Sequence, residues 1–262
     1  MCLLVLAWQA HPRYRLVVAA NRDEFHARPA AALAEWPPPA QILAGRDLQA
    51  GGAWLGVDRG RRFGVVTNFR ELQPPQPGAP SRGSLIPRYL AAARGAPPGA
   101  GEFFAALERE ASAYSGFNLL LTDAQTLWYG SNRTAPFARA LAPGVHGLSN
   151  ELLDTPWPKL RRVRSGFEAW LRQPDSPPAG LFDLLADRTT TALADAETGG
   201  LPREWARALS APFVLNPRYG TRCSTLLLQE PSGALYLAER RFDPAGSLTG
   251  ESEFQLAADE WP

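Results

Sequence analysis

The stretch Cys2-Leu3-Leu4-Val5-Leu6-Ala7-Trp8 follows Met1 directly and is apolar at almost every position. A strand covered on both faces has this composition, whereas a strand with one face in water alternates apolar and polar residues. The breaker Ala10-His11-Pro12 then predicts a turn, and residues 15–20 predict a second strand that returns beside the first. This hairpin would bring the run Asn21-Arg22-Asp23-Glu24 close to Cys2.

The rest of the chain alternates groups of strands with groups of helices. Strands are expected at residues 51–57, 63–68, 117–122, 126–130, 138–141, 144–149, 213–215, 223–229, 234–240 and 253–257; helices at 85–94, 102–112, 158–172 and 181–193; loops at 29–39 and 71–80. Regular strand–helix–strand alternation is absent, which argues against a doubly wound parallel sheet. We expect an α+β fold of two antiparallel sheets packed together and covered by helices, as one domain over residues 1–262.

The composition excludes several function classes. The 262 residues carry a net charge of +1, so no general field attracts the chain to nucleic acid or to an anionic membrane. The apolar N-terminal run lacks a basic region before it and is too short to cross a bilayer. Only two cysteines are present, Cys2 and Cys223, which favours a reducing, cytoplasmic location over a secreted disulfide scaffold.

Common catalytic and cofactor motifs are missing from the sequence. There is no GxGxxG, P-loop, CxxC, HExxH or GxSxG pattern. The three histidines, His11, His26 and His146, have no metal-ligand spacing, so no metal site and no required cofactor are expected.

Cys2 is the candidate catalytic nucleophile of the sequence. Methionine is removed efficiently before a small residue, and removal of Met1 would leave Cys2 with a free α-amine beside its own thiol. That amine has a reference pKa of about 7.7–8.0, so it can act as a base near neutral pH. One residue would then supply nucleophile and base without a histidine. The alternative is that Cys2 is a small apolar residue at the start of a strand.

Polar residues at the ends of apolar strands could serve Cys2. Asp23 could hold the α-amine, and Arg22 could favour the thiolate. Asn68 and Asn150 each follow an apolar strand, where a side-chain amide can donate to a developing oxyanion. Arg222 precedes the apolar strand at 223–229.

The chain resembles the NRDE family, also called the transport-and-Golgi-organisation family. The resemblance is carried by Met1-Cys2, Ala19–Phe25 with Arg28-Pro29, Gly51–Gly56, Thr67-Asn68, Gly116–Leu119, Gly147–Asn150 with Thr155-Pro156-Trp157, and Tyr219–Arg222. These motifs extend over nearly the whole chain, and the NRDE run with a cysteine at position two is specific.

That family is in turn similar to choloylglycine hydrolase and penicillin V acylase, which are cysteine N-terminal-nucleophile enzymes. The resemblance implies a four-layer αββα sandwich and matches Cys2, Asp23, Asn68, Asn150 and Arg222 to the functional residues of that group. An arginine expected three residues before the aspartate is replaced by Ala20, and we expect Arg22 to act instead, from the other side of the strand.

Three functions remain open at this point. The first is hydrolysis of an amide or thioester of an acyl substrate by Cys2, with the apolar arm of the substrate against Trp54, Phe69 and Trp157. The second is binding and trafficking of haem or of an acyl-CoA or other lipid on the same scaffold, as the resemblance implies; His26, His146 or Cys2 would then be candidate haem ligands. The third is a conventional hydrolase that pairs Cys2 with one of the histidines.

Overall fold

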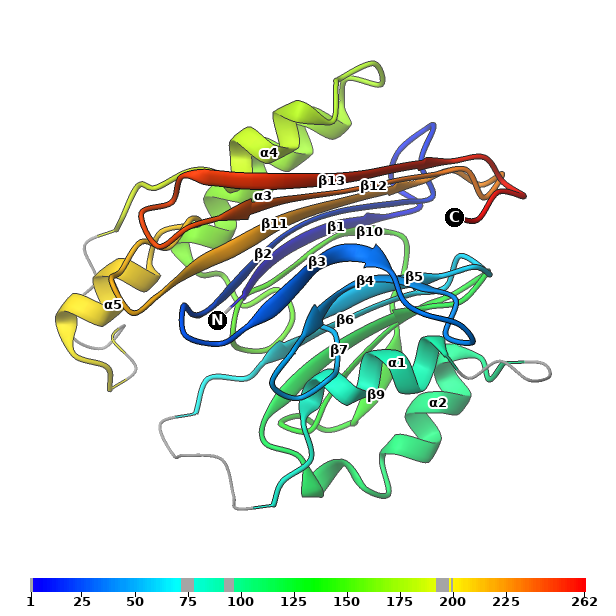
Figure 1. Cartoon of the computed structure of the whole chain (residues 1–262), viewed down its shortest axis with the longest axis horizontal. Helices are drawn as coiled ribbons and strands as arrows, with labels where there is room; N and C mark the ends of the chain where they lie inside the picture. The colour runs from blue at the N-terminus through cyan, green and yellow to red at the C-terminus, as the bar shows by residue number, and fades with distance from the viewer. Residues whose placement is uncertain (1, 72–77, 92–96, 192–197, 199) are drawn as a thin grey trace. The chain divides into compact units, whose positions relative to one another are not determined.

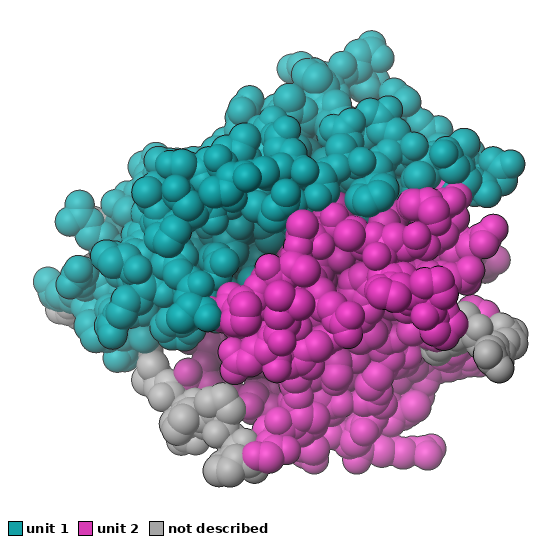
Figure 2. Space-filling view, in the orientation of Figure 1, with its two compact units in different colours: residues 1–27, 143–149, 154–260 teal, residues 28–142, 150–153, 261–262 magenta. Residues whose placement is uncertain are grey.

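The computed structural model describes residues 2–71, 78–91, 97–191, 198 and 200–262. They divide into two compact units, coloured separately in Figure 2. Unit 1 comprises residues 1–27, 143–149 and 154–260, and unit 2 comprises residues 28–142, 150–153 and 261–262. Each unit has its own sheet and its own hydrophobic core, so the single domain expected over residues 1–262 stays a prediction about how the two units act together.

Unit 1 contains a six-stranded antiparallel sheet in the order β10-β1-β2-β11-β12-β13 (Figure 1). Its strands are β1 (Cys2–Trp8), β2 (Leu16–Phe25), β10 (Gly144–Leu148), β11 (Tyr219–Gln229), β12 (Leu235–Phe242) and β13 (Leu248–Leu256). The predicted hairpin at the N-terminus is confirmed, because β1 pairs with β2 from Cys2 opposite Arg22 to Trp8 opposite Leu16.

Helices α3 (Pro158–Leu171) and α4 (Ala179–Leu185) pack on one face of this sheet, and α5 (Arg203–Leu209) precedes β11. Leu160, Val163 and Phe167 recur at helical spacing and are buried against Leu3 and other residues of that face. Gly147 permits close approach, since a Cβ there would lie 2.7 Å from Leu160 Cδ1. This packing fixes α3 beside β1 and β10.

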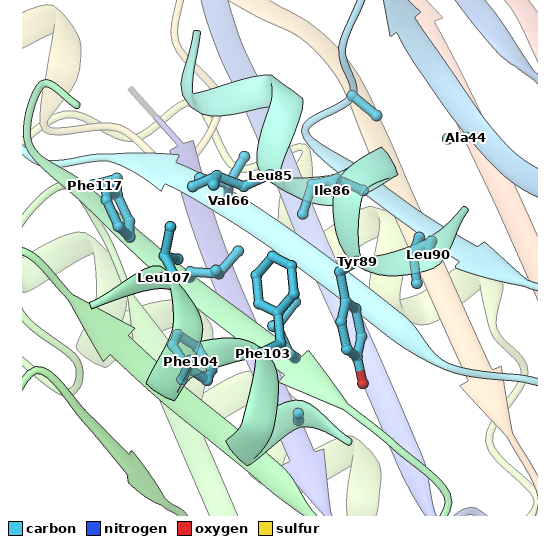
Figure 3. Close-up of a cluster of buried hydrophobic side chains, with 14 of the residues drawn as sticks. Ala44, Val66, Leu85, Ile86, Tyr89, Leu90, Phe103, Phe104, Leu107 and Phe117 are labelled. Carbon is cyan, nitrogen blue, oxygen red and sulfur yellow. The ribbon is translucent and has the colours of Figure 1, made fainter. Parts of the chain in front are cut away.

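Unit 2 contains a seven-stranded antiparallel sheet in sequence order from β3 to β9. The strands are β3 (Ala30–Glu35), β4 (Ile42–Asp47), β5 (Leu55–Asp58), β6 (Phe63–Asn68), β7 (Phe117–Thr122), β8 (Leu127–Ser131) and β9 (Ala138–Ala140). Helices α1 (Leu85–Leu90) and α2 (Ala100–Leu107), with the short 3-10 helices η1 (Arg82–Ser84) and η2 (Ala111–Ala113), complete the unit. Tyr89 and Phe103 meet edge-on in its core, which Figure 3 shows.

The predicted fold class, α+β with two antiparallel sheets and covering helices, is confirmed. Several local predictions were wrong. Residues 29–39 are not all loop, because β3 forms there and pairs with β4, which was not predicted. Alanine-rich segments have low β propensity, so only the partner strand decides the conformation of β3. Residues 213–215 are not a strand, and α5 was missed.

The observed bounds of other elements also differ from the predicted ones. The Asn21–Glu24 run lies inside β2, because β11 extends the ladder past it, and Arg222 lies inside β11 rather than before it. The helix expected at 181–193 is α4, which ends at Leu185; residues 192–197 lie outside the described residues. Most of the loop expected at 71–80 and part of the helix expected at 85–94 also lie outside them. Among the described residues no helix is long and apolar enough to cross a membrane.

Candidate active site

Cys2 is the first residue of β1 and lies in one cross-strand row with Arg22 of β2 and Cys223 of β11. Directly paired residues of a sheet place their side chains on the same face. The guanidinium group of Arg22 is therefore next to two thiols. Ala20 and Arg22 are two positions apart and share this face, so the expectation that Arg22 acts from the other side of the strand was wrong.

The environment of Cys2 keeps its thiol protonated. Burial raises the pKa of the Cys2 thiol, and the negative charge of Asp23 raises it further. The positive charges of the amino terminus and of Arg22, and a hydrogen bond from the backbone of Asp23, lower this pKa but do not outweigh burial. Because the thiolate is the nucleophile, Cys2 needs a nearby base to react at neutral pH.

Asp23 is a buried carboxylate held by β11. Its Oδ1 accepts a hydrogen bond of 2.7 Å from Thr221 Oγ1, and its backbone carbonyl accepts one of 2.7 Å from the Tyr219 hydroxyl. Burial raises the pKa of Asp23, whereas the charges of the amino terminus and of Lys159 and the Thr221 hydroxyl lower it. The carboxyl group is thus fixed in position and electrostatically coupled to the start of the chain.

Arg222 is the extra residue of a β-bulge. Thr221 pairs with Asp23 and Cys223 pairs with Arg22, which leaves Arg222 between the two pairs. Its Nη1 donates to the carbonyl oxygens of Phe25 at 3.0 Å and His26 at 3.1 Å. Arg222 therefore fastens the end of β2, and its charge interacts with that of Arg22.

The two asparagines expected at the site, Asn68 and Asn150, belong to unit 2. Asn68 ends β6 opposite Phe117. Asn150 is buried, has a left-handed backbone with φ of 61°, and accepts a hydrogen bond of 2.7 Å at its carbonyl from the Arg70 backbone. Both asparagines thus lie beside the end of β6. Their convergence with Cys2 stays a prediction.

Comparison with known proteins identifies the family. The family model for Transport and Golgi organisation 2 matches residues 1–244. This chain belongs to that family. It is 32% identical to the mouse Transport and Golgi organization 2 homolog over 98% of this chain and 99% of that protein. It is 24% identical to Transport and Golgi organization protein 2 of Drosophila melanogaster over 97% and 99% of the two chains.

A solved structure shows the same fold. The crystal structure of the C2A mutant of conjugated bile acid hydrolase from Clostridium perfringens matches with a TM-score of 0.52 over 100% of this chain and 95% of that chain, at 8% sequence identity. The expected N-terminal-nucleophile hydrolase fold of this chain is confirmed.

The aromatic residues expected to line a substrate pocket are each partly buried in this family member. Trp54 lies over Gly45, where a Cβ would approach a ring carbon of Trp54 to 2.0 Å. Phe69 follows β6 and donates from its backbone to Gly116 at 2.9 Å. Trp157 precedes α3 and packs against the core of unit 1. Contact of any of them with a substrate stays a prediction.

Cys223 is not placed to form a disulfide with Cys2. Neither cysteine is in a disulfide, and β2 lies between their strands. Two strand spacings separate their Cα atoms by about 10 Å, whereas a disulfide needs less than about 7 Å. Burial and the negative charge of Glu239 raise the pKa of the Cys223 thiol well above its ordinary value. Cys223 is thus the less reactive thiol.

The histidines His26 and His146 contact polar groups of other residues. His26 Nε2 lies 3.0 Å from the Asn216 carbonyl, and His146 Nδ1 lies 3.1 Å from Asp154 Oδ2. In the part of the chain that the structure describes, no group of three or more His, Cys, Asp or Glu side chains could hold a metal ion.

Sequence reasoning missed two members of the site, Thr221 and Lys159. Thr221 belongs to the Tyr219–Arg222 motif, but its contact with Asp23 spans 198 residues and has no local pattern. Only the composition could have pointed to Lys159, because it is the single lysine among 27 basic residues.

Proposed function

We propose that this protein is a cysteine N-terminal-nucleophile hydrolase that cleaves an amide or thioester bond of an acyl substrate, with Cys2 as nucleophile. The observation that supports this most is the grouping at the start of β1. There Cys2 is directly opposite Arg22 and accepts a hydrogen bond from the Asp23 backbone.

The reaction begins when removal of Met1 exposes the α-amine of Cys2. The amine takes the thiol proton, and the thiolate sulfur attacks the acyl carbonyl carbon. The resulting oxyanion accepts hydrogen bonds from Asn68 or Asn150. The ammonium group then protonates the leaving nitrogen or sulfur as its bond to carbon breaks, leaving an acyl thioester on Cys2. Water attacks this ester with the amine as base, and a carboxylic acid departs.

Three side chains prepare these steps. The raised pKa of the Cys2 thiol makes a base necessary, and Asp23 orients the amine that serves as this base. Arg22 opposes the effect of burial by stabilising the thiolate. Arg222 holds the backbone at the end of β2, on which Asp23 lies. Trp54, Phe69 and Trp157 are the proposed contacts of the apolar arm of the substrate.

The solved neighbour adds support for a hydrolase. It is a conjugated bile acid hydrolase crystallised as a C2A mutant, so its natural sequence also has a cysteine at position two. Neither of the two cysteines is in a disulfide, which suits the proposed reducing, cytoplasmic location.

A carrier of haem or acyl-CoA is the second candidate. The names of the relatives refer to transport rather than to catalysis, which favours it. For haem, His146 has the arrangement that suits a ligand, because a carboxylate on Nδ1 orients the ring and leaves Nε2 for iron. The carrier would use the same scaffold without turnover.

One experiment separates the two candidates. Intact-mass analysis first checks that Met1 is absent. The protein is then incubated with a panel of acyl-CoA thioesters and N-acyl amino acids, and with haem, while free CoA, released acid and acyl adducts are followed. The hydrolase predicts an adduct on Cys2 and turnover that Cys2→Ala abolishes and Cys223→Ala leaves intact. Retention of Met1, or stoichiometric binding unaffected by Cys2→Ala, would reject the hydrolase in favour of the carrier.

A further inference from the structure

Lys159 is the only lysine among the 27 lysine and arginine residues of the chain, and only 4% of its surface is exposed. Exposed cations elsewhere are all arginines, so the sequence does not use lysine for ordinary surface charge. Lysine differs from arginine in having a compact ammonium group on a flexible stem. A single lysine in a buried place therefore indicates a local requirement for that group.

The position of Lys159 is unfavourable for a positive charge. It is the second residue of α3, where the helix dipole disfavours cations, and its burial removes it from water. The neighbouring cations of α3 have surface contacts instead: Arg162 pairs with Asp187, and Arg164 pairs with Glu168. Lys159 needs a compensating negative charge inside unit 1.

Asp23 is a buried acid on which the charge of Lys159 acts. It is 2% exposed, and the positive charge of Lys159 lowers its pKa against the effect of burial. The other charged groups that act on Asp23 are the amino terminus and Glu24, with the Thr221 hydroxyl as hydrogen-bond donor. Glu24 and burial favour the protonated acid, so the ionised form depends on the remaining groups.

The packing of α3 holds Lys159 in place. The next residue, Leu160, contacts β10 at Gly147 and belongs to the same core cluster as Leu3, the neighbour of Cys2. Leu3 pairs with Asn21, and Asp23 is two positions further along β2, so Asp23 lies on the same face of the sheet as Leu3, the face that α3 covers. An ammonium group at this point acts on the carboxylate that in turn acts on the Cys2 thiol.

We propose that Lys159 is the buried charge partner of Asp23, a positioning residue that keeps this carboxyl group ionised beside Cys2. This role rests on the proposed hydrolase only where it concerns catalysis. An ionised Asp23 can orient the Cys2 α-amine and stabilise it after it has taken the thiol proton. Lys159 itself transfers no proton and does not touch the substrate.

The single lysine permits a direct test on the wild-type protein. Biosynthetic labelling with ε-¹³C-lysine produces one lysine resonance, whose chemical shift is followed with pH by NMR. We expect a second, smaller inflection in this titration where Asp23 gains its proton. In Asp23→Asn the pKa of Lys159 should fall by at least about one unit, because burial then acts on the ammonium without a carboxylate. Thr221→Val, which retains the carboxylate, should move it less than half as far.

Two results of this titration would contradict the proposal. A wild-type titration with one inflection, or a pKa of Lys159 that is the same in Asp23→Asn, would overturn the charge pair. The wild-type measurement needs no variant, so a failure of Asp23→Asn to fold leaves the test complete.

Catalysis provides a separate readout. If turnover is found, Lys159→Met should move the acidic limb of the kcat/KM profile to higher pH. Lys159→Arg, which keeps the charge but not the compact ammonium group, should move the limb less far. Arg161→Met, which removes an exposed cation of the same helix, is the matched control and should leave the limb in place. An unmoved limb in Lys159→Met would remove the catalytic role. An absence of turnover, together with a lysine titration that shows both inflections, would reject the hydrolase and keep the charge pair.

Discussion

The hydroxyl group of Thr221 connects Asp23 to the backbone of the segment before β11. It donates to Asp23 Oδ1 at 2.7 Å and accepts from the Val214 backbone N–H at 2.9 Å. Both neighbours are buried, so neither has water as a substitute partner.

Thr221→Val should therefore destabilise the fold by about 1.5–3 kcal/mol, the usual cost of losing a hydrogen bond to a charged group. The pKa of Asp23 is already raised in the folded state, and the loss of this donor raises it further. Folding then binds a proton over a wider pH range, so stability falls as pH rises above the unfolded pKa of the carboxyl. Urea unfolding at several pH values should show the smallest deficit in acid; Thr221→Ser should restore most of the loss.

Arg22 should control the reactivity of Cys2. Arg22→Met removes a charge that lowers the pKa of the thiol, so alkylation of Cys2 by iodoacetamide near pH 8 should slow about three- to tenfold. Arg22→Lys should retain most of the rate. Peptide mass spectrometry separates Cys2 from the buried Cys223, which should react more slowly in every variant. Equal alkylation in Arg22→Met would show that the guanidinium does not act on the thiol.

Cys2 and Cys223 should not form an intramolecular disulfide under mild oxidation with diamide. Their strands are separated by β2, and that spacing exceeds the reach of a disulfide. Non-reducing intact-mass analysis should show no loss of two hydrogens. Formation of that bond in folded protein would mean that β2 leaves the sheet.

Arg62 and Asp58 form a buried ion pair in unit 2. Arg62 Nε lies 2.7 Å from Asp58 Oδ2, and its Nη2 donates to the Leu90 carbonyl at 3.0 Å. Arg62→Met leaves a buried carboxylate without its cation and should cost about 3–5 kcal/mol near neutral pH. The pKa of Asp58, raised by burial, should rise further without Arg62, so the deficit should shrink towards acid. Adding Asp58→Asn should recover part of the loss in denaturant unfolding.

Asn118 should hold the segment that carries Asn150. Its Nδ2 donates to the Glu151 carbonyl at 2.9 Å, and its Oδ1 accepts from the Tyr129 hydroxyl at 2.7 Å. Asn118→Ala should cost about 1–3 kcal/mol and accelerate hydrogen exchange at residues 150–153. Tyr129→Phe should give a smaller effect at Leu153, whose N–H lies 3.2 Å from that hydroxyl. Unchanged exchange in Asn118→Ala would contradict this role.

Structure that forms between residues close together in the sequence could be predicted. The apolar run at Cys2–Trp8 and the breaker after it predicted the N-terminal hairpin, because both strands and their turn are contiguous. The strand β7 was predicted at residues 117–122, where it lies. By contrast β3 was missed, since its alanine-rich residues have no intrinsic preference for a strand and adopt one through pairing with β4.

The sequence by itself determined the fold class, the family and the first residue of the site. A continuous apolar strand and specific short motifs carry that information locally, and it is readable at Cys2 and at the run from Asn21 to Glu24. Tertiary structure decided which side chains surround Cys2 and Asp23. The bulge at Arg222, the contact of Thr221 with Asp23 and the burial of Lys159 arise from strands and a helix far apart in the chain, and their electrostatic effects exist only after those elements have excluded water.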